Sequence, residues 1–196
     1  MSRPIGRNSE DTKKFIKEIA TKIFEYKGYT TTSMDDIKKE TNLSKGTIYY
    51  HFKNKEDLYL YCLTQASTDF VKKWDIMSQS KSTAEQKLYS WAKLNSMLHQ
   101  PLTNTIPEYL VAVKKDDSTN VISLFKPEFD IIKTILEYGK ETGEFKSNLD
   151  TDSACVILFS LISSLSNSYI YGFKTPEEQK NLYLNAIDII IQGLKV

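Results

Sequence analysis

Apolar residues recur every three to four positions along most of the chain, which is the spacing of one face of an α-helix. The clearest stripe lies in residues 11–27, where Lys and Glu occupy the opposite face and Gly28 follows as a helix-ending residue. No segment shows the strict alternation of apolar and polar positions that is typical of strands. The pattern therefore predicts an all-α fold.

Three helix starts follow within 25 residues. Ser33, Ser44 and Asn54 each have the side chain of an N-cap residue and precede a run with helical spacing. Asn42 tolerates the left-handed backbone that a tight turn between the first two helices requires. These residues predict a compact helical head that leads into a long helix over residues 55–77.

The helical pattern continues downstream in longer segments. Ser82 with Glu85 is typical of a capping box, and Pro101 ends the helix that it opens. Residues 101–120 predict short helix alternating with loop. From Val121 to Thr142 the pattern resumes, with Pro127 either kinking a helix or starting it afresh.

The segment from Ser153 to Phe173 carries no charged residue, and its 21 residues are about long enough to span a membrane. Its second half is rich in Ser and Asn, so a helix buried in a protein interface is the favoured interpretation. The first ten residues lack the apolar core of a signal peptide. We therefore expect a cytoplasmic protein that does not associate with a membrane.

Charge and cysteine content narrow the picture further. The formal net charge is +1, but residues 1–60 hold 12 Lys and Arg against 9 Asp and Glu. This end is the one suited to a polyanion, although a solvated helix face gives the same count. Cys62 and Cys155 lie far apart in apolar surroundings, which predicts buried free thiols.

Residues 33–52 have the organisation of a helix-turn-helix, whose second helix enters the major groove of DNA. Lys45 could donate to guanine, the methyl of Thr47 could contact thymine, and Gly46 would allow close approach of the backbone. The remaining candidates suit contacts to phosphate: Thr32, Ser33, Tyr49, Tyr50, His51 and Lys55. The alternative is an ordinary corner between two helices with a solvated polar face.

The run TTTSMDDIKKETNLSKGTIYYHFKNKEDLYL resembles the DNA-binding motif of TetR-type transcriptional repressors. This resemblance implies that the nine candidates named above fall where family members touch DNA. Two departures are visible, since Lys38 stands where the family usually has Ala and Asn42 where it usually has Gly. Neither lies on the reading face, so they bear on local stability alone.

The resemblance also implies a domain organisation. A flexible arm of residues 1–9, in which Arg3 and Arg7 could reach a minor groove, precedes a DNA-binding domain of residues 10–70. Residues 71–196 would then bind an effector and dimerise through helices 151–171 and 176–195. The expected interface residues are Ser160, Ser164, Ser168, Leu182, Ala186, Ile189 and Ile190. A core within one monomer is the alternative for these positions.

The resemblance further implies an effector pocket between the middle helices. Its candidate lining is aromatic and Met-rich, which favours a fairly apolar ligand: Phe70, Trp74, Trp91, Met97, Tyr109, Phe125 and Phe129. Each of these could equally be plain core. The two histidines, His51 and His99, belong to no catalytic set, and no metal-ligand cluster or phosphate loop is present in the sequence. We expect neither an enzyme nor a cofactor.

The resulting prediction is a homodimeric repressor that binds a palindromic operator in double-stranded DNA and is released by a small-molecule effector. An activator would share these features. A helical ligand-binding or partner-binding protein whose head no longer reads DNA is the principal alternative. An enzyme built on a helical bundle is disfavoured by the absent catalytic residues.

Overall fold

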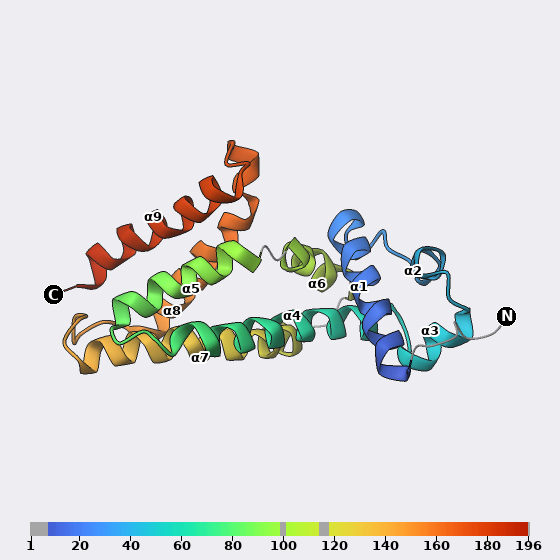
Figure 1. The fold of residues 1–196 in the computed structure, drawn as a ribbon, viewed down its shortest axis with the longest axis horizontal. Helices are drawn as coiled ribbons and strands as arrows, with labels where there is room; N and C mark the ends of the chain where they lie inside the picture. The colour runs from blue at the N-terminus through green and yellow to red at the C-terminus, as the bar shows by residue number, and fades with distance from the viewer. Residues whose placement is uncertain (1–7, 99–100, 114–117, 196) are drawn as a thin grey trace. The chain divides into compact units, whose positions relative to one another are not determined.

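The computed structural model describes residues 8–98, 101–113 and 118–195 (Figure 1). Their helices are α1 (Ser9–Lys27), α2 (Met34–Thr41), α3 (Lys45–His51), α4 (Lys55–Ser78), α5 (Ala84–Leu98), η1 (Pro101–Thr105), α6 (Ile106–Val113), α7 (Ser118–Glu141), α8 (Thr151–Ser164), η2 (Leu165–Tyr171) and α9 (Pro176–Leu194). Within these ranges there is no β-sheet, and one isolated bridge pairs Phe145 with Lys195. The all-α prediction is confirmed. Arg3, Arg7 and His99 lie outside the described residues.

The chain forms two compact units. The first, called the head below, contains residues up to 66 together with residues 101–122. The second, called the bundle, contains residues 67–100 and 123–196. The expected boundary near residue 70 lies close to this division, but η1 and α6 group with the head because η1 packs on α1. Such a contact between distant segments has no local signal in the sequence.

Local side-chain chemistry starts most of the helices where the sequence predicts them. Ser33 and Asp36 form a reciprocal capping box at α2, and Thr175 and Glu178 form another at α9. At α5 the predicted box of Ser82 and Glu85 is wrong. The Thr83 hydroxyl accepts from the backbone N–H of Gln86 instead, at 3.1 Å, and the helix starts one residue later than predicted.

A proline and a glycine with structural consequences lie in α7. The helix runs continuously through Pro127, so neither a restart nor a break occurs there. Gly139 lies in the helix interior, where a Cβ atom would stand 2.1 Å from the buried ring of Phe145. The close approach of this ring accounts for a glycine at a position where it weakens a helix.

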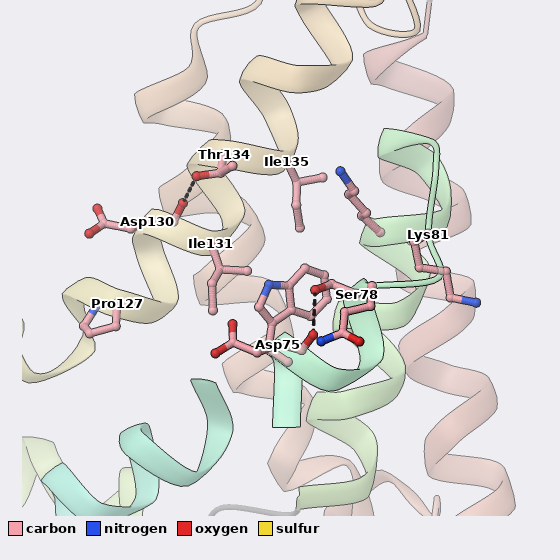
Figure 2. Close-up of a pocket in the computed structure, with 11 residues that line it drawn as sticks. Asp75, Ser78, Lys81, Pro127, Asp130, Ile131, Thr134 and Ile135 are labelled. Atoms are coloured by element: carbon pink, nitrogen blue, oxygen red, sulfur yellow. Dashed lines mark hydrogen bonds between the residues drawn. The ribbon is translucent and has the colours of Figure 1, made fainter. Parts of the chain in front are cut away.

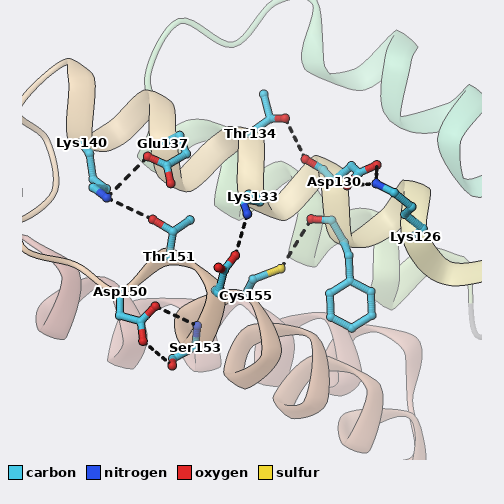
Figure 3. Close-up of polar contacts among 12 residues, drawn as sticks. Lys126, Asp130, Lys133, Thr134, Glu137, Lys140, Asp150, Thr151, Ser153 and Cys155 are labelled. Atoms are coloured by element: carbon cyan, nitrogen blue, oxygen red, sulfur yellow. Dashed lines mark hydrogen bonds and ion pairs between the residues drawn. The ribbon is translucent and has the colours of Figure 1, made fainter. Parts of the chain in front are cut away.

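Polar contacts join α7 to α8 along one side of the bundle (Figure 3). The Lys133 ammonium lies 2.6 Å from the Asp152 carboxylate, and Lys140 donates to the Thr151 hydroxyl at 3.2 Å. The buried thiol of Cys155 donates to the carbonyl of Phe129 at 3.5 Å. Both cysteines are free and buried, as predicted.

The uncharged segment is not one regular helix. It changes from α-helix to 3-10 helix at Leu165, and a 3-10 turn has three residues rather than 3.6. The spacing of four residues would place Ser160, Ser164 and Ser168 in one stripe along a regular α-helix. The tighter turn separates them, so that Ser160 and Ser164 are exposed whereas Ser168 is buried. The segment Thr151–Tyr171 is long and apolar enough to cross a membrane, and 28% of its most apolar window is buried.

Candidate nucleic-acid interface and effector region

The helix-turn-helix is built by caps and by a small apolar core. Asn42 has the left-handed backbone predicted for the turn, with φ 53° and ψ 26°. The Ser44 hydroxyl accepts from the N–H of Thr47 and so caps α3. Three side chains on the inner face are buried: Ile37 from α2, Leu43 from the turn and Ile48 from α3. This leaves the opposite face of α3 open to solvent.

The exposed face of α3 carries the residues expected to read bases. Lys45 and Gly46 are exposed, and Thr47 is half-buried with its hydroxyl 2.8 Å from that of Ser44. The Lys45 ammonium lies 5.6 Å from the centre of the Tyr49 ring. Tyr49 and Tyr50 are also exposed, a location that suits the expected contacts to a DNA backbone. Half-buried His51 meets the Tyr50 ring edge to face, with 5.0 Å between their centres.

Gly46 has no role in the packing of the head itself. A Cβ atom there would meet one neighbouring atom, the Ser44 hydroxyl oxygen, at 3.9 Å, and its backbone is ordinary helix. A helical glycine costs roughly 0.5–1 kcal/mol of stability relative to alanine. The fold of the head alone therefore does not require a glycine at this position. Close approach of DNA to the backbone at Gly46 stays a prediction.

We predict that Gly46→Ala stabilises the protein while weakening its DNA binding. The free energy of unfolding should rise by about 0.5–1 kcal/mol, because alanine is the better helix former. Operator affinity should fall because the added methyl group stands between the helix and the bases. Denaturant unfolding and operator titration measure the two effects. An unchanged or tighter operator complex would show that nothing approaches Gly46.

The residues expected at phosphates before α2 and at the start of α4 have partners inside the head. Thr32 is buried, and its hydroxyl donates to the carbonyl of Gly28 at 2.6 Å. Exposed Ser33 caps α2. The Lys55 ammonium donates to the backbone carbonyls of Tyr29 and Thr32, each at 2.8 Å. Lys55 therefore has a role in the fold that its place at a helix start did not indicate.

The structure brings together some of the expected effector residues and separates two others. Phe70 and Trp91 lie in the bundle core, where Trp74 is also nearly buried, and the ring of Phe129 stacks on that of Phe159 at 4.2 Å. Phe125 is buried nearby on the same helix. Met97 is 64% exposed, and Tyr109 belongs to the head, where its ring packs on that of Tyr29. Helical spacing alone could not separate these two from the rest.

An open groove lies on the bundle beside Trp74 (Figure 2). Its volume is about 490 Å³, which is within the range of small-molecule sites. The lining combines apolar and charged groups from the end of α4, the loop after it, the start of α5, and α7. Among its residues are Trp74, Asp75, Lys81, Lys87, Ile131 and Ile135. Apart from Trp74, sequence reasoning did not find these residues, because most of them look like ordinary surface positions.

A carboxylate of α7 is buried in the bundle and is not among the residues that line the groove. Glu128 is 5% exposed, and within the described part of the chain its Oε1 atom has no hydrogen-bond partner. Burial raises the pKa of Glu128 to about 7, and the nearby hydroxyl of Ser67 offsets part of that shift. The signal was present in the sequence, since Glu128 interrupts an apolar stripe of α7 that continues at Ile132 and Ile135. Such groups concentrate at functional sites.

Comparison with known proteins identifies the family. Residues 16–62 match the sequence model described as bacterial regulatory proteins, tetR family, and residues 66–196 match that of the QacR-like protein, C-terminal region. Together the two matches cover nearly the whole chain. The chain belongs to the TetR family of transcriptional regulators. It is therefore a DNA-binding regulator rather than an enzyme, as the sequence predicted.

Relatives of this TetR-family chain include named regulators. The HTH-type transcriptional regulator QacR of Staphylococcus aureus is 27% identical over 171 residues, covering 85% of this chain and 86% of QacR. The fatty acid metabolism regulator protein of Bacillus subtilis is 23% identical over 158 residues, which cover 79% of this chain and 81% of that protein. A further relative, IcaR of Staphylococcus epidermidis, is named a negative transcriptional regulator and is 26% identical over 143 residues, covering 56% of this chain and 77% of IcaR.

Solved structures share the fold over almost its full length. The fatty acid degradation regulator FadR of Bacillus halodurans superposes with a TM-score of 0.80 at 20% identity, covering 99% of this chain and 98% of FadR. FadR of Bacillus subtilis, solved in complex with stearoyl-CoA, superposes with a TM-score of 0.77 at 22% identity. The match covers 92% of this chain and 98% of that FadR. At these identities the likeness establishes the TetR-family fold.

Proposed function

We propose that the protein is a cytoplasmic, homodimeric repressor that binds a near-palindromic operator and releases it when a small, fairly apolar effector binds. The observation that carries this proposal is the exposed start of α3 on a capped helix-turn-helix, where Lys45 and Gly46 face solvent and Thr47 is half-buried beside them. Two such heads in one dimer would contact two half-sites, which explains the symmetry expected of the operator.

A dimer is supported by the apolar surface of the bundle. Large side chains that are more than half exposed gather on α8, η2 and α9: Val156, Ile157, Tyr169, Ile170, Tyr171 and Ile189. Exposed apolar surface of this kind is typical of protein interfaces. Of the predicted interface residues, Ser160, Ser164 and Ile189 are exposed and Leu182 and Ile190 partly so, whereas Ser168 and Ala186 are buried.

An effector site in the bundle is supported by the groove beside Trp74 and by the buried carboxylate of Glu128. The aromatic residues in the core of the bundle suit a ligand that is largely apolar. A group on the ligand that donates a hydrogen bond would satisfy the Oε1 atom of Glu128, which costs free energy while it is buried without a partner. The stearoyl-CoA bound by FadR of Bacillus subtilis shows that a regulator with this fold holds a ligand with a long apolar chain.

The proposed response is a shift between two populations of the dimer. The long helix α4 begins in the head at Lys55 and ends in the bundle at Ser78. A ligand that prefers one arrangement of the bundle would bias this helix and so the placement of the head. Because ligand and operator prefer different arrangements, each weakens the binding of the other by the same factor.

The direct test is a binding selection on random duplex DNA at a stated salt concentration. An enriched inverted repeat, with half-sites about one helical turn apart, would support both the reading head and the dimer. Absence of enrichment before and after the protein is denatured and refolded would contradict the proposal. Refolding removes a co-purified effector that could hold the released state.

We predict that Lys45→Ala and Thr47→Ala each weaken the selected operator about 10-fold and relax the sequence preference at particular positions. The reason is that base contacts discriminate, whereas contacts to phosphate do not. The control is Lys39→Ala on the exposed surface of α2, which removes a charge from the head without touching α3. Repeating the selection with each variant measures the change. A uniform loss at all sites with Lys45→Ala would contradict a base-reading role.

A further inference from the structure

The turn between α1 and α2 is held by two charged side chains from distant parts of the sequence. This turn, residues 28–32, lies outside any helix, so its backbone groups need partners from elsewhere. It leads directly into Ser33, the cap of α2. Its position therefore determines where the helix-turn-helix begins.

The N–H groups of the turn are bound by Glu108 of α6. One carboxylate oxygen accepts from the N–H of Tyr29 at 3.1 Å and the other from the N–H of Thr30 at 2.6 Å. Hydrogen bonds from Thr30 and Tyr29 lower the pKa of Glu108, and the charge of Lys55 acts in the same direction. The carboxylate thus remains ionised while it holds the turn.

Gly28 allows the Glu108 carboxylate to approach the backbone of the turn. It has φ 85°, a backbone that other residues rarely adopt, and a Cβ atom there would stand 2.4 Å from Oε2 of Glu108. Any side chain at this position would displace the carboxylate. The turn is therefore shaped to receive it.

The carbonyl groups of the same turn are bound by Lys55 of α4. Its ammonium donates to Tyr29 and Thr32 at 2.8 Å and lies 3.3 Å from the carbonyl of Thr30. It also stands 4.3 Å from the centre of the Tyr29 ring. A lysine with these partners has little freedom to reach a DNA phosphate, since each donor would have to leave a carbonyl.

Aromatic packing brings α6 to this place. The Tyr109 ring meets that of Tyr29 edge to face at 4.9 Å, and its hydroxyl donates to the Glu56 carboxylate at 3.1 Å. On the neighbouring η1, the Thr105 hydroxyl lies 2.7 Å from that of Tyr59. These contacts fix η1 and α6 on the head, and so hold the Glu108 carboxylate beside the turn.

We propose that Glu108 and Lys55 are positioning residues for DNA recognition, which clamp the 28–32 turn from opposite sides and so set the start of α2. The proposal rests on the DNA-binding function proposed above. Lys55 then contributes to operator affinity through the turn and makes no contact with phosphate. Glu108 contributes although it lies in the part of the sequence matched to the C-terminal family model.

Amide hydrogen exchange tests the clamp in the free protein, independently of any operator. Glu108→Gln keeps the shape but removes the charge and one acceptor. We expect exchange at the N–H groups of Tyr29 and Thr30 to become about 10-fold faster. The matched control, Glu40→Gln, removes an exposed carboxylate from α2 and should leave both amides unchanged. Unchanged exchange in Glu108→Gln would overturn the clamp, even if the protein proved not to bind DNA.

The salt dependence of operator binding separates positioning from contact with phosphate. Lys55→Met keeps the length of the side chain and removes its charge. If Lys55 positions the turn, the affinity falls about 10-fold while the slope of log K against log salt stays as in the wild type. A slope reduced by about one would show a phosphate contact and overturn the assignment. Glu108→Gln should give the same loss of affinity with the same unchanged slope.

Discussion

Replacing Ile157 by glutamate is expected to convert the protein from a dimer to a monomer and to weaken operator binding about 100-fold or more. Ile157 is 57% exposed on α8, within the apolar surface proposed as the interface. Two-fold symmetry places two copies of the new carboxylate in one interface, where each would be buried without a partner. The operator loses affinity because a monomer engages one half-site, whereas a dimer binds two at once.

The measurements are sedimentation velocity on the free protein and titration of the selected operator. Ile76→Glu is the matched control, since Ile76 is 73% exposed in the same unit but on α4, outside the proposed interface. It should leave both the mass and the affinity unchanged. A variant Ile157→Glu that remains as dimeric as the control would show that the subunits associate elsewhere, and a monomeric wild type would refute the dimer altogether.

The parts of the fold that the sequence predicted well depend on neighbours within a few residues. The cap of Ser33, the left-handed Asn42 and the start of α3 after Ser44 each follow from side-chain chemistry within one turn of helix. The exposure of the candidate residues on α3 was predictable for the same reason. Their positions relative to the helix start determine which of them are exposed.

The parts that could not be predicted depend on contacts between distant segments. Tyr109 has the composition of a pocket residue, but packing of α6 places it in the head beside Tyr29. The stripe of serines fails at Ser168 because the helix tightens after Ser164, and this change has no clear signal in the residues themselves. Lys55 shows the same limit, because its partners lie more than twenty residues earlier in the chain.

A second large effect is expected from the pH dependence of stability at Glu128. In the folded protein its pKa is about 7, against an ordinary value of 4.5, because burial disfavours the charged form. Below pH 4.5 the carboxyl is protonated in both the folded and the unfolded chain, so its titration does not change the free energy of unfolding there. As the pH rises above 4.5 the unfolded chain loses its proton first, and stability is progressively lost until the folded carboxyl ionises near pH 7. The total loss is about 3 kcal/mol.

Glu128→Gln should abolish this loss, because an amide has the same shape and no charge to desolvate. We expect the variant to gain about 3 kcal/mol over the wild type between pH 4.5 and pH 8, measured as the difference between their free energies of unfolding in denaturant. Glu141→Gln, an exposed carboxylate on the same helix, is the control for removing a surface charge. Parallel stability profiles for Glu128→Gln and the wild type would contradict a neutral buried carboxyl at pH 6.

The same titration reports on the effector. A ligand that donates a hydrogen bond to Glu128 stabilises the carboxylate and lowers its pKa, so the wild type should lose less stability with rising pH when the ligand is bound. The variant should bind such a ligand more weakly at pH 8, where the wild type presents a charge. The stabilised variant would then hold the operator even at effector concentrations that release the wild type. The burial of Glu128, which lowers the stability of the free protein, is therefore explained if the ligand donates the hydrogen bond that the carboxylate lacks.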